Sequence, residues 1–417
     1  MKEEISMRET RGSAPEGRRS PTVAVLGAGP VGLDAALAAR AEGFRVVVYE
    51  AATTPAGHVR SWGHVRLFSP WSMNVSPRMR AGLEELGRPL EVDEDATHTG
   101  HELADRVLDP LWTLPELKEG LQLGTRVLGV SRRGTLKSER IGDPARGQEP
   151  FRLLLQGPDG REWVDHADIV LDCTGRYGNP NALGDGGIPA PGERALEDRI
   201  ERWIPDLSTG TDGWKGKVVL LAGSGHSAQT AARDLAAAPG NGGGPRVLWV
   251  LRRDDPEWGS VEDDPLPLRS SLARTAGELA AGSTPRITPL PGRVVDRLTR
   301  AGSRVQVELR GTDGSVETHQ VDRILSLTGG VGDHTLYRQL QVHECYATSG
   351  PMKLAAALLG AEAGADCLTQ ESHGAETLKN PEPDFFILGD KSYGRNSSFL
   401  MRVGWNQVDE VFSVIAS

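Results

Sequence analysis

The chain has 417 residues, of which 25% are charged and 38% are hydrophobic, and its formal net charge is −10. This length exceeds what one compact core accommodates, so it indicates two domains or one domain with an insertion. The acidic balance argues against nucleic acid or an anionic membrane surface as a partner, and no apolar run is long enough to cross a bilayer.

Residues 1–20 are polar and rich in Arg, Glu, Gly and Ser, which predicts a disordered leader, with a tag or a targeting remnant as the alternative. They lack the apolar segment of a secretory signal. The three cysteines, Cys173, Cys345 and Cys367, contain no C-x-x-C pair, so the chain lacks the local redox disulfide of thioredoxin-like enzymes. We therefore expect a protein of the reducing cytoplasm.

An apolar segment at residues 22–27 predicts a buried parallel strand, followed by a G-x-G-x-x-G turn, an Ala-rich helix over 33–43 and a strand over 45–50. Glycines in such a turn permit the sharp bend, the approach of a pyrophosphate and close packing of the helix on the strand. Glu50 ends the second strand, where it can accept hydrogen bonds from ribose hydroxyls. The turn expected to bind a dinucleotide consists of Gly27, Gly29, Pro30, Val31 and Gly32.

Weaker patterns fill the stretch up to the next repeat. Apolar periodicity and glycine and proline content predict a loop at 51–77, helices at 78–86 and 101–108, strands at 122–130, 151–156 and 169–173, and a loop at 175–193.

The pattern of strand, glycine turn and Ala-rich helix begins again at Lys217, and a strand at 246–251 follows. The repeat predicts an α/β fold of two Rossmann-like three-layer domains, the second (205–320) inserted into the first (21–204 and 321–417). Further strands are predicted at 293–298 and 304–309. The second turn consists of Gly223, Gly225, His226, Ser227 and Ala228, with Ala at the position that requires a small residue.

Arg252 and Arg253 stand where an NADH-binding domain would place an acidic residue. Because a guanidinium pairs with a 2′-phosphate, this pair favours NADPH over NADH; the alternative is a solvated pair at a strand end. His226 either stacks on the cofactor or caps the helix.

Two short motifs complete the pattern: Asp172 to Gly175 (DCTG) after an apolar strand, and Gly389-Asp390 at the end of a strand over 384–390. In this order the motifs resemble the paired nucleotide-binding flavoproteins, which include thioredoxin reductases and flavin-containing monooxygenases. The resemblance implies FAD at the first turn, near a chain crossing at Thr174 and Gly175, with Asp390 on the ribityl chain. It also implies that a helix over 405–415, which carries Gln407, points its positive end at the flavin.

Residues 63–77 (GHVRLFSPWSMNVSP) resemble the segment that lies over the flavin in the monooxygenase branch of this superfamily. By this resemblance Arg66 contacts the cofactor, and Ser69, Trp71 and Asn74 line the flavin face as catalytic candidates, with ordinary loop packing as the alternative. A second set of residues, Lys391, Tyr393 and Arg395, either reaches the substrate cavity or lies on the surface.

The resemblance thus implies an enzyme that binds FAD, consumes NADPH and transfers one oxygen from a flavin C4a-(hydro)peroxide to a small molecule, either a ketone or a soft nucleophile (N, S or As). The alternatives are an NADPH-dependent flavoprotein reductase without oxygen insertion, and a nucleotide-sensing scaffold that has lost turnover. We expect no metal site, because no Cys or carboxylate pattern completes the pair His98 and His101. A homodimer is left open.

Overall fold

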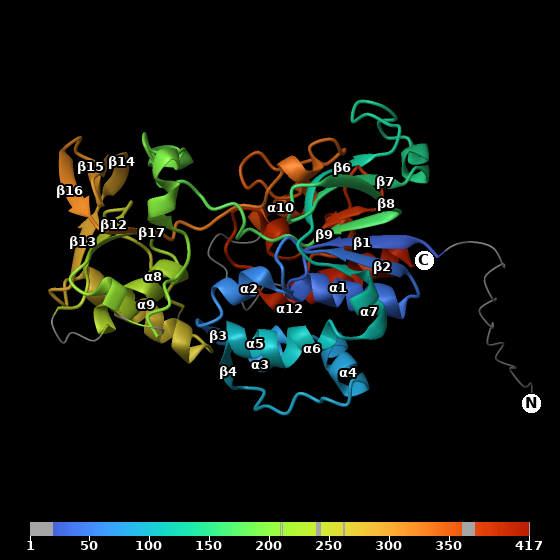
Figure 1. Cartoon of the computed structure of the whole chain (residues 1–417), viewed down its shortest axis with the longest axis horizontal. Helices are drawn as coiled ribbons and strands as arrows, with labels where there is room; N and C mark the ends of the chain where they lie inside the picture. The colour runs from blue at the N-terminus through green and yellow to red at the C-terminus, as the bar shows by residue number, and fades with distance from the viewer. Residues whose placement is uncertain are drawn as a thin grey trace, which may run out of the picture.

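The computed structural model describes residues 20–208, 210, 212–238, 243–261, 263–360 and 372–416. Two lobes lie side by side and are joined by two segments of the chain (Figure 1). Apart from Ser20, the predicted leader lies outside the described residues, and so does Cys367.

The first lobe is built on a five-stranded parallel sheet with the strand order β18-β9-β1-β2-β5. Strand β1 lies at its centre and pairs in parallel with β2 and β9. The five strands are β1 (Thr22–Leu26), β2 (Arg45–Tyr49), β5 (Leu121–Gln122), β9 (Ile169–Asp172) and β18 (Phe385–Ile387).

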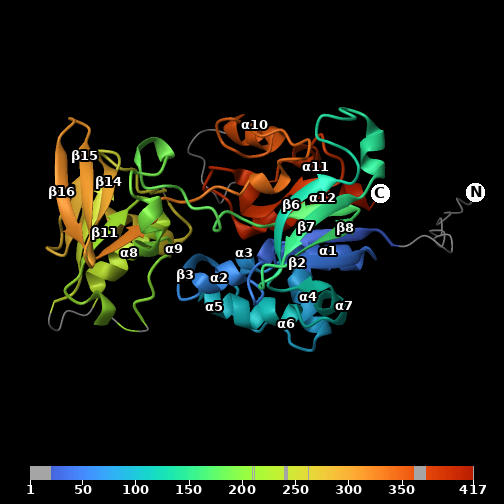
Figure 2. The ribbon, with the colours of Figure 1, turned by 45° about the horizontal axis from the view of Figure 1, so that its top comes forward.

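Both faces of this sheet are buried, which is why β1 is an unbroken apolar run. Val23 and Val25 pack with the helices, whereas Ala24 and Leu26 pack with an antiparallel three-stranded sheet. Figure 2 shows this small sheet on one side of β1 and β2, with α1 and α7 on the other.

The helices of this lobe are α1 (Pro30–Ala41), α2 (Gly57–Ser61), α3 (Trp71–Asn74), α4 (Pro77–Glu85), α5 (Gly100–Leu103), α6 (Asp109–Leu111), α7 (Pro115–Gly120), α10 (Met352–Gly360), α11 (Ala375–Leu378) and α12 (Met401–Ile415), with π-helical residues Ala104–Leu108 between α5 and α6. The remaining strands are β3 (Arg66–Pro70), β4 (Thr97–Thr99), β6 (Arg126–Arg132), β7 (Phe151–Gln156) and β8 (Glu162–Ala167).

The second lobe repeats these three layers. Its parallel sheet has the order β10-β17-β11-β12-β13. Val219 and Leu221 of β11 pack against α8, and the alternating residues Leu220 and Ala222 pack against an antiparallel sheet. The elements are β10 (Ile200–Glu201), β11 (Val218–Ala222), α8 (His226–Ala237), β12 (Arg246–Leu251), α9 (Pro267–Ala280), β13 (Ile287–Pro291), β14 (Arg293–Ala301), β15 (Arg304–Gly311), β16 (Val316–Val321) and β17 (Arg323–Ser326).

All strands of the second sheet fall between β9 and β18 in the sequence, so the second unit is inserted into the first, as predicted. Strands β10 and β17 lie just outside the range 205–320. The two crossing segments are hydrogen-bonded to each other: the Asn181 backbone N–H donates to the Gly329 carbonyl, and its side chain donates to the Thr328 carbonyl. No helix among the described residues is long and apolar enough to traverse a lipid bilayer.

Several local predictions are wrong. The segment 51–77 is not a loop but contains α2, β3 and α3. Strand β3 was missed because its partner, β4, comes about 30 residues later in the sequence. The strand predicted at 122–130 is two strands in different sheets, separated by a turn at Gly124, whose φ is +65°. The helix predicted from Trp405 begins at Met401. Strands β8, β13 and β16 and helices α7 and α9 were not predicted.

Candidate functional site

The first glycine turn leads from β1 into the N-terminus of α1. Gly27 has a φ of +98°, and a Cβ there would lie 2.8 Å from the Cys173 carbonyl oxygen. A Cβ on Gly32 would lie 2.0 Å from the Gly27 oxygen, so neither position accepts a side chain. At Gly29, by contrast, a Cβ would meet no atom within 4 Å, and no side chain caps the helix. An uncapped helix N-terminus that faces open space suits a phosphate.

Glu50 stands directly behind this turn. Its two carboxylate oxygens accept hydrogen bonds from the backbone N–H groups of Ala28 (2.8 Å) and Ala52 (2.9 Å). A carboxylate can accept about four hydrogen bonds, so capacity remains for ribose hydroxyls. Arg66 lies on β3, half exposed, and donates to the Thr97 carbonyl oxygen at 2.6 Å.

Val31, at the start of α1, is where three predicted motifs meet. A Cβ on Gly389 would lie 3.2 Å from its side chain, and a Cβ on Gly404 of α12 would lie 2.6 Å from it. The glycine turn, the Gly-Asp turn and the N-terminal part of α12 are therefore packed together. No side chain caps the N-terminus of α12, so its positive end is available to a ligand.

The Gly-Asp turn is held by partners from distant segments. Gln407 is buried, accepts a hydrogen bond from the Gly389 N–H (2.8 Å) and donates one to the Ser392 hydroxyl (2.9 Å). Its amide thus orients the turn from behind. Asp390 accepts a hydrogen bond from Arg176 Nε at 2.6 Å, and burial raises the pKa of Asp390, an effect that Arg176 opposes.

A buried ion pair lies beside this turn. Lys391 Nζ donates to Asp172 Oδ2 (2.6 Å), to the Asp333 carbonyl oxygen (2.7 Å) and to the Thr174 hydroxyl (3.2 Å). The Thr174 hydroxyl in turn donates to Asp172 Oδ1 at 2.7 Å. The network thus links the first crossing segment, at Thr174 and Gly175, to the second crossing segment, at Asp333. Lys391 and Tyr393 are therefore buried rather than on the surface.

Asn74, Ser69 and Trp71 form one buried cluster with His98. Asn74 donates to the Ser69 carbonyl oxygen (3.0 Å) and to His98 Nε2 (2.8 Å), and it accepts from the Ser69 hydroxyl (3.0 Å). The indole of Trp71 stacks on the His98 ring with centroids 3.9 Å apart. Burial lowers the pKa of His98. The three predicted residues are thus brought together, and the Asn74 amide is fully engaged within the cluster.

The second glycine turn repeats the geometry of the first. Gly223 has a φ of +126°, Ala228 is buried, and a Cβ on Gly225 would meet no atom within 4 Å. No side chain caps α8, and Ser227 is exposed in its first turn. The ring of His226 lies 5.1 Å from that of Phe68 in β3, so the second turn contacts the first lobe.

The titratable and charged side chains near the second turn lie in different environments. Burial lowers the pKa of His226, and Arg269 lowers it further. Arg253 is paired with Glu257 at 2.9 Å. Arg252 is exposed and makes no hydrogen bond or ion pair within the part of the chain that the structure describes. Its guanidinium is thus available to an anionic group.

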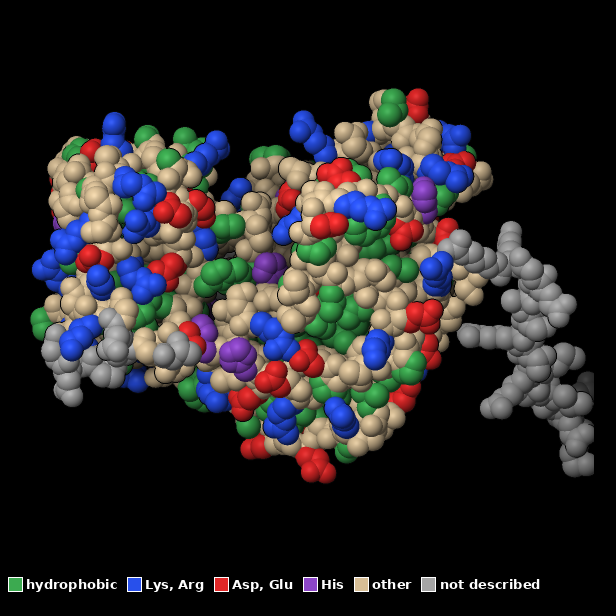
Figure 3. Space-filling model, viewed as in Figure 1, with side chains coloured by type: hydrophobic (Ala, Val, Ile, Leu, Met, Phe, Trp, Pro, Cys, Tyr) green, Lys and Arg blue, Asp and Glu red, His purple; other side chains and the backbone are tan. Residues whose placement is uncertain are grey.

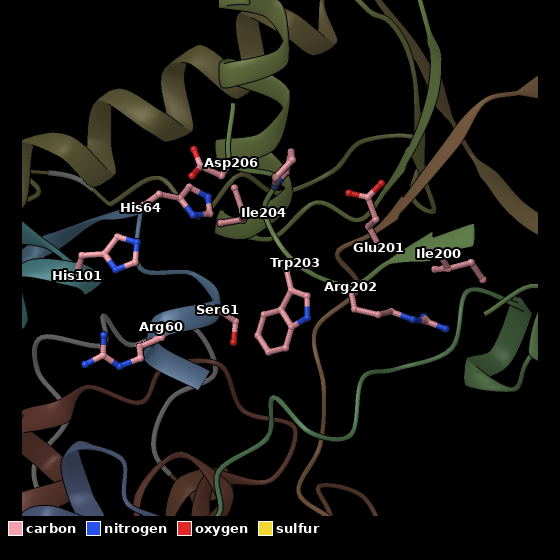
Figure 4. Close-up of a pocket in the computed structure, with 11 residues that line it drawn as sticks. Arg60, Ser61, His64, His101, Ile200, Glu201, Arg202, Trp203, Ile204 and Asp206 are labelled. Carbon is pink, nitrogen blue, oxygen red and sulfur yellow. The ribbon is translucent and has the colours of Figure 1, made fainter. Parts of the chain in front are cut away.

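A cavity of about 510 Å³ lies between the two lobes. Figure 3 shows the furrow between the lobes, with histidine side chains along it. His64 and His101 of the first lobe and Trp203, which follows β10 of the second lobe, line the same cavity (Figure 4). The sequence did not single out Trp203, Tyr177 or Arg176 for this region, although Arg176 and Tyr177 directly follow the Thr-Gly motif.

The described cysteines are free thiols in different environments. Burial raises the pKa of Cys173 well above its usual value, whereas hydrogen bonds from Thr348 lower that of Cys345. Within the described ranges no group of three or more His, Cys, Asp or Glu side chains is arranged to hold a metal ion.

Comparison with known families identifies the first glycine turn. Residues 25–80 match the family described as an NAD(P)-binding Rossmann-like domain, which confirms the dinucleotide-binding fold predicted there. No curated protein matches the chain.

The whole fold is similar to several solved structures. Bacillithiol disulfide reductase from Bacillus cereus is 18% identical, with a TM-score of 0.65 over 95% of this chain and 99% of that chain. Ornithine N-hydroxylase from Kutzneria sp. 744, solved with reduced FAD, NADP⁺ and L-ornithine, is 13% identical, with a TM-score of 0.61 over 95% and 99%. A variant flavin monooxygenase from Stenotrophomonas maltophilia is 17% identical, with a TM-score of 0.55 over 96% and 99%. These matches confirm the predicted fold class and the resemblance to paired dinucleotide-binding flavoproteins at the level of the fold.

Proposed function

We propose that this chain is an FAD-dependent monooxygenase that consumes NADPH. The observation that carries the proposal is the pair of uncapped glycine turns, open at Gly29 and Gly225, of which the second contacts the first lobe through His226 and Phe68. Two dinucleotides held at these turns would extend toward the region between the lobes. The ornithine N-hydroxylase and the flavin monooxygenase have the same fold.

The residues of the first lobe have separate roles in holding FAD. The N-terminus of α1 binds the pyrophosphate and Glu50 binds the ribose. Asp390, oriented by Arg176, accepts hydrogen bonds from the ribityl chain. The N-terminus of α12 stabilises negative charge on the flavin ring. Thr174 and Gly175 form the chain crossing beside it, and the Lys391 network fixes their position.

NADPH is held by the second lobe. The N-terminus of α8 binds its pyrophosphate, and Arg252 pairs with the 2′-phosphate. FAD held in the first lobe would supply the chemistry, which is acceptance of a hydride from NADPH and transfer of one atom of O₂ to the substrate. In the balanced reaction, NADPH, H⁺, O₂ and the substrate give NADP⁺, water and the oxygenated substrate.

In this reaction the cluster of Ser69, Trp71 and Asn74 positions the segment that covers the flavin. Its hydrogen bonds are satisfied internally, which makes this wall of the site rigid. A rigid, dry wall excludes water from the reacting atoms.

The proposal is tested with FAD-loaded protein, NADPH and isotope-labelled O₂, offered a thioether, a tertiary amine, arsenite and a ketone in separate reactions. We expect labelled oxygen in at least one product, with NADPH consumed in equal amount. If every NADPH oxidised yields H₂O₂ and no labelled product, the monooxygenase assignment is wrong.

A reductase is the second candidate, and one observation favours it. Hydrogen bonds from Thr348 lower the pKa of Cys345, a direction that favours the nucleophilic thiolate, while the side chain itself is buried. Cys173, beside the Thr-Gly crossing, has a raised pKa and does not support such chemistry. A reductase would pass electrons to a disulfide or quinone without O₂, and a thiol-based one would lose this activity in Cys345→Ser.

A further inference from the structure

Four aromatic side chains gather between α2 and the start of the second lobe: His58 lies in α2, Trp62 directly follows α2, Tyr177 lies in the first crossing segment, and Trp203 follows β10. The Tyr177 and Trp203 rings stack with centroids 5.3 Å apart and an interplanar angle of 13°. Trp62 stacks on Tyr177 at 6.3 Å, and His58 lies 5.9 Å from Tyr177 and 5.8 Å from Trp203. We refer to these four residues as the aromatic stack. It joins the first lobe to the crossing that leads into the second.

The aromatic stack is open to solvent on one side. Tyr177 is 48% exposed, although large aromatic side chains are normally well buried. Trp203 lines the 510 Å³ cavity between the lobes, a volume in the range of small-molecule sites. Trp203 thus offers flat apolar surface to a ligand in this cavity, and Tyr177, which stacks on Trp203, offers its exposed ring beside the cavity.

Polar atoms beside the stack lack partners within the described part of the chain. The Trp62 indole N–H and His64 Nε2 are both buried without a hydrogen bond. A buried donor without an acceptor is costly, so a ligand that supplies an acceptor is favoured there. His64 lines the cavity itself and Trp62 belongs to the stack.

The charged groups of the cavity are already engaged with the protein. Arg202 is paired with Glu193 and Glu197, and Arg60 is paired with Asp109.

The acidic side chains of the lining are engaged in the same way. Glu201 is paired with Arg323 at 2.7 Å, and Asp206 accepts hydrogen bonds from the Ser208 hydroxyl and backbone N–H. The lining thus carries two guanidiniums and two carboxylates, all engaged within the protein, so neither sign of charge is left over to hold a charged ligand.

We propose that the aromatic stack and the adjoining cavity bind the substrate of the proposed monooxygenase, and that this substrate is an uncharged aromatic compound with a hydrogen-bond acceptor. The inference rests on the proposed function only where it calls the ligand a substrate; the binding site itself does not depend on that function. It distinguishes this chain from the ornithine N-hydroxylase of the same fold, whose ligand is a charged amino acid.

The test measures binding by calorimetry to FAD-loaded oxidised protein without NADPH, so that no turnover is needed. The probes are methyl phenyl sulfoxide, which is aromatic and carries an acceptor, methyl phenyl sulfide, dimethyl sulfoxide, benzoate and L-ornithine. We expect the aromatic sulfoxide to bind most tightly. Tighter binding of benzoate or L-ornithine would overturn the assignment.

Variants locate the binding. Trp203→Leu and Tyr177→Leu should each weaken sulfoxide binding by about tenfold, the order of the loss expected for one aromatic contact. Tyr177→Phe should retain affinity. Trp163→Leu is the matched control, because Trp163 is 38% exposed on β8, in the antiparallel sheet of the first lobe. Unchanged affinity in both Leu variants would place the ligand elsewhere.

The nicotinamide ring of the cofactor is also a flat aromatic group, so the same titration is repeated with saturating NADP⁺. Retained sulfoxide binding supports a separate substrate site, and loss of binding in competition assigns the stack to nicotinamide and overturns the proposal. Stack-dependent binding without any labelled product would refute the monooxygenase alone. Labelled product from a substrate whose binding ignores the stack would refute the inference alone.

Discussion

The ammonium of Lys391 lies 2.6 Å from the carboxylate of Asp172, and both side chains are at most 1% exposed. The pair ties the end of β9 to the Gly-Asp turn across 219 residues of sequence. Removing one member of a buried pair leaves the other charge without compensation.

Lys391→Met should therefore lower the free energy of unfolding by about 3 to 5 kcal/mol, measured by urea denaturation. Lys379→Met is the control, because Lys379 is 40% exposed in its pair with Glu376 and should change stability by less than about 1 kcal/mol. The double variant Asp172→Asn/Lys391→Met should be more stable than Lys391→Met. Equal effects of the two lysine substitutions would show that the buried pair is not important for stability.

The cluster around His98 predicts a pH dependence. The Thr99 carbonyl can only accept, so His98 Nδ1 carries the hydrogen, and Nε2 accepts from Asn74. If Nε2 were protonated, its N–H and the Asn74 amide N–H would point at each other, two donors without an acceptor. Burial also lowers the pKa of His98. A lowered folded-state pKa gives stability that is present above the unfolded pKa, about 6.5, and is lost as the pH falls through the folded pKa.

The free energy of unfolding should thus decrease as the pH falls below about 6.5, and His98→Phe should reduce that slope by up to one proton, about 1.4 kcal/mol per pH unit. Burial also lowers the pKa of His58 and His226, so part of the slope should remain in the variant. The same slope in wild type and His98→Phe would contradict the assignment.

Arg252 and Arg253 should differ in their effect on cofactor choice. Arg252 is unpaired within the described residues and Arg253 is engaged by Glu257. Arg252→Ala should raise the KM for NADPH by about 10- to 100-fold, which corresponds to one charge-assisted contact of about 1.5 to 3 kcal/mol, and leave the KM for NADH unchanged. Arg253→Ala is the matched control with a smaller effect. Equal losses with both cofactors would exclude a 2′-phosphate contact.

Gly29 and Gly225 offer a matched pair of substitutions. Each has extended backbone angles and open space at the Cβ position, so Ala fits the fold but intrudes where a pyrophosphate approaches. Gly29→Ala should reduce the FAD content of the purified protein, whereas Gly225→Ala should retain FAD, both at unchanged apoprotein stability. If Gly225→Ala loses FAD and Gly29→Ala retains it, the two cofactors are assigned to the wrong turns.

The sequence predicted what is encoded locally. Strands β1 and β11, the glycine turns and the helices after them follow from continuous apolar runs and the spacing of the glycines, and they are present in the structure. Strands β8 (EWVDHA) and β16 (VETHQV) were missed because polar residues occur on both faces of each, so no alternation of apolar and polar residues marks them in the sequence.

In the candidate site, too, the sequence predicted only groupings of residues that lie close together in the chain. Asn74 and Ser69 are five residues apart, and the sequence grouped them. Lys391 meets Asp172, and Arg176 meets Asp390, only because the fold brings the two crossings beside the Gly-Asp turn. No local pattern encodes such contacts.

The central claim is that two turns hold two dinucleotides whose reactive rings meet between the lobes. Anaerobic mixing of the FAD-loaded protein with NADPH tests it directly, with the flavin absorbance followed by stopped flow. The account predicts rapid loss of the oxidised flavin absorbance, at least tenfold slower in Gly225→Ala at limiting NADPH. Protein that carries FAD yet is not reduced by NADPH or NADH would contradict it.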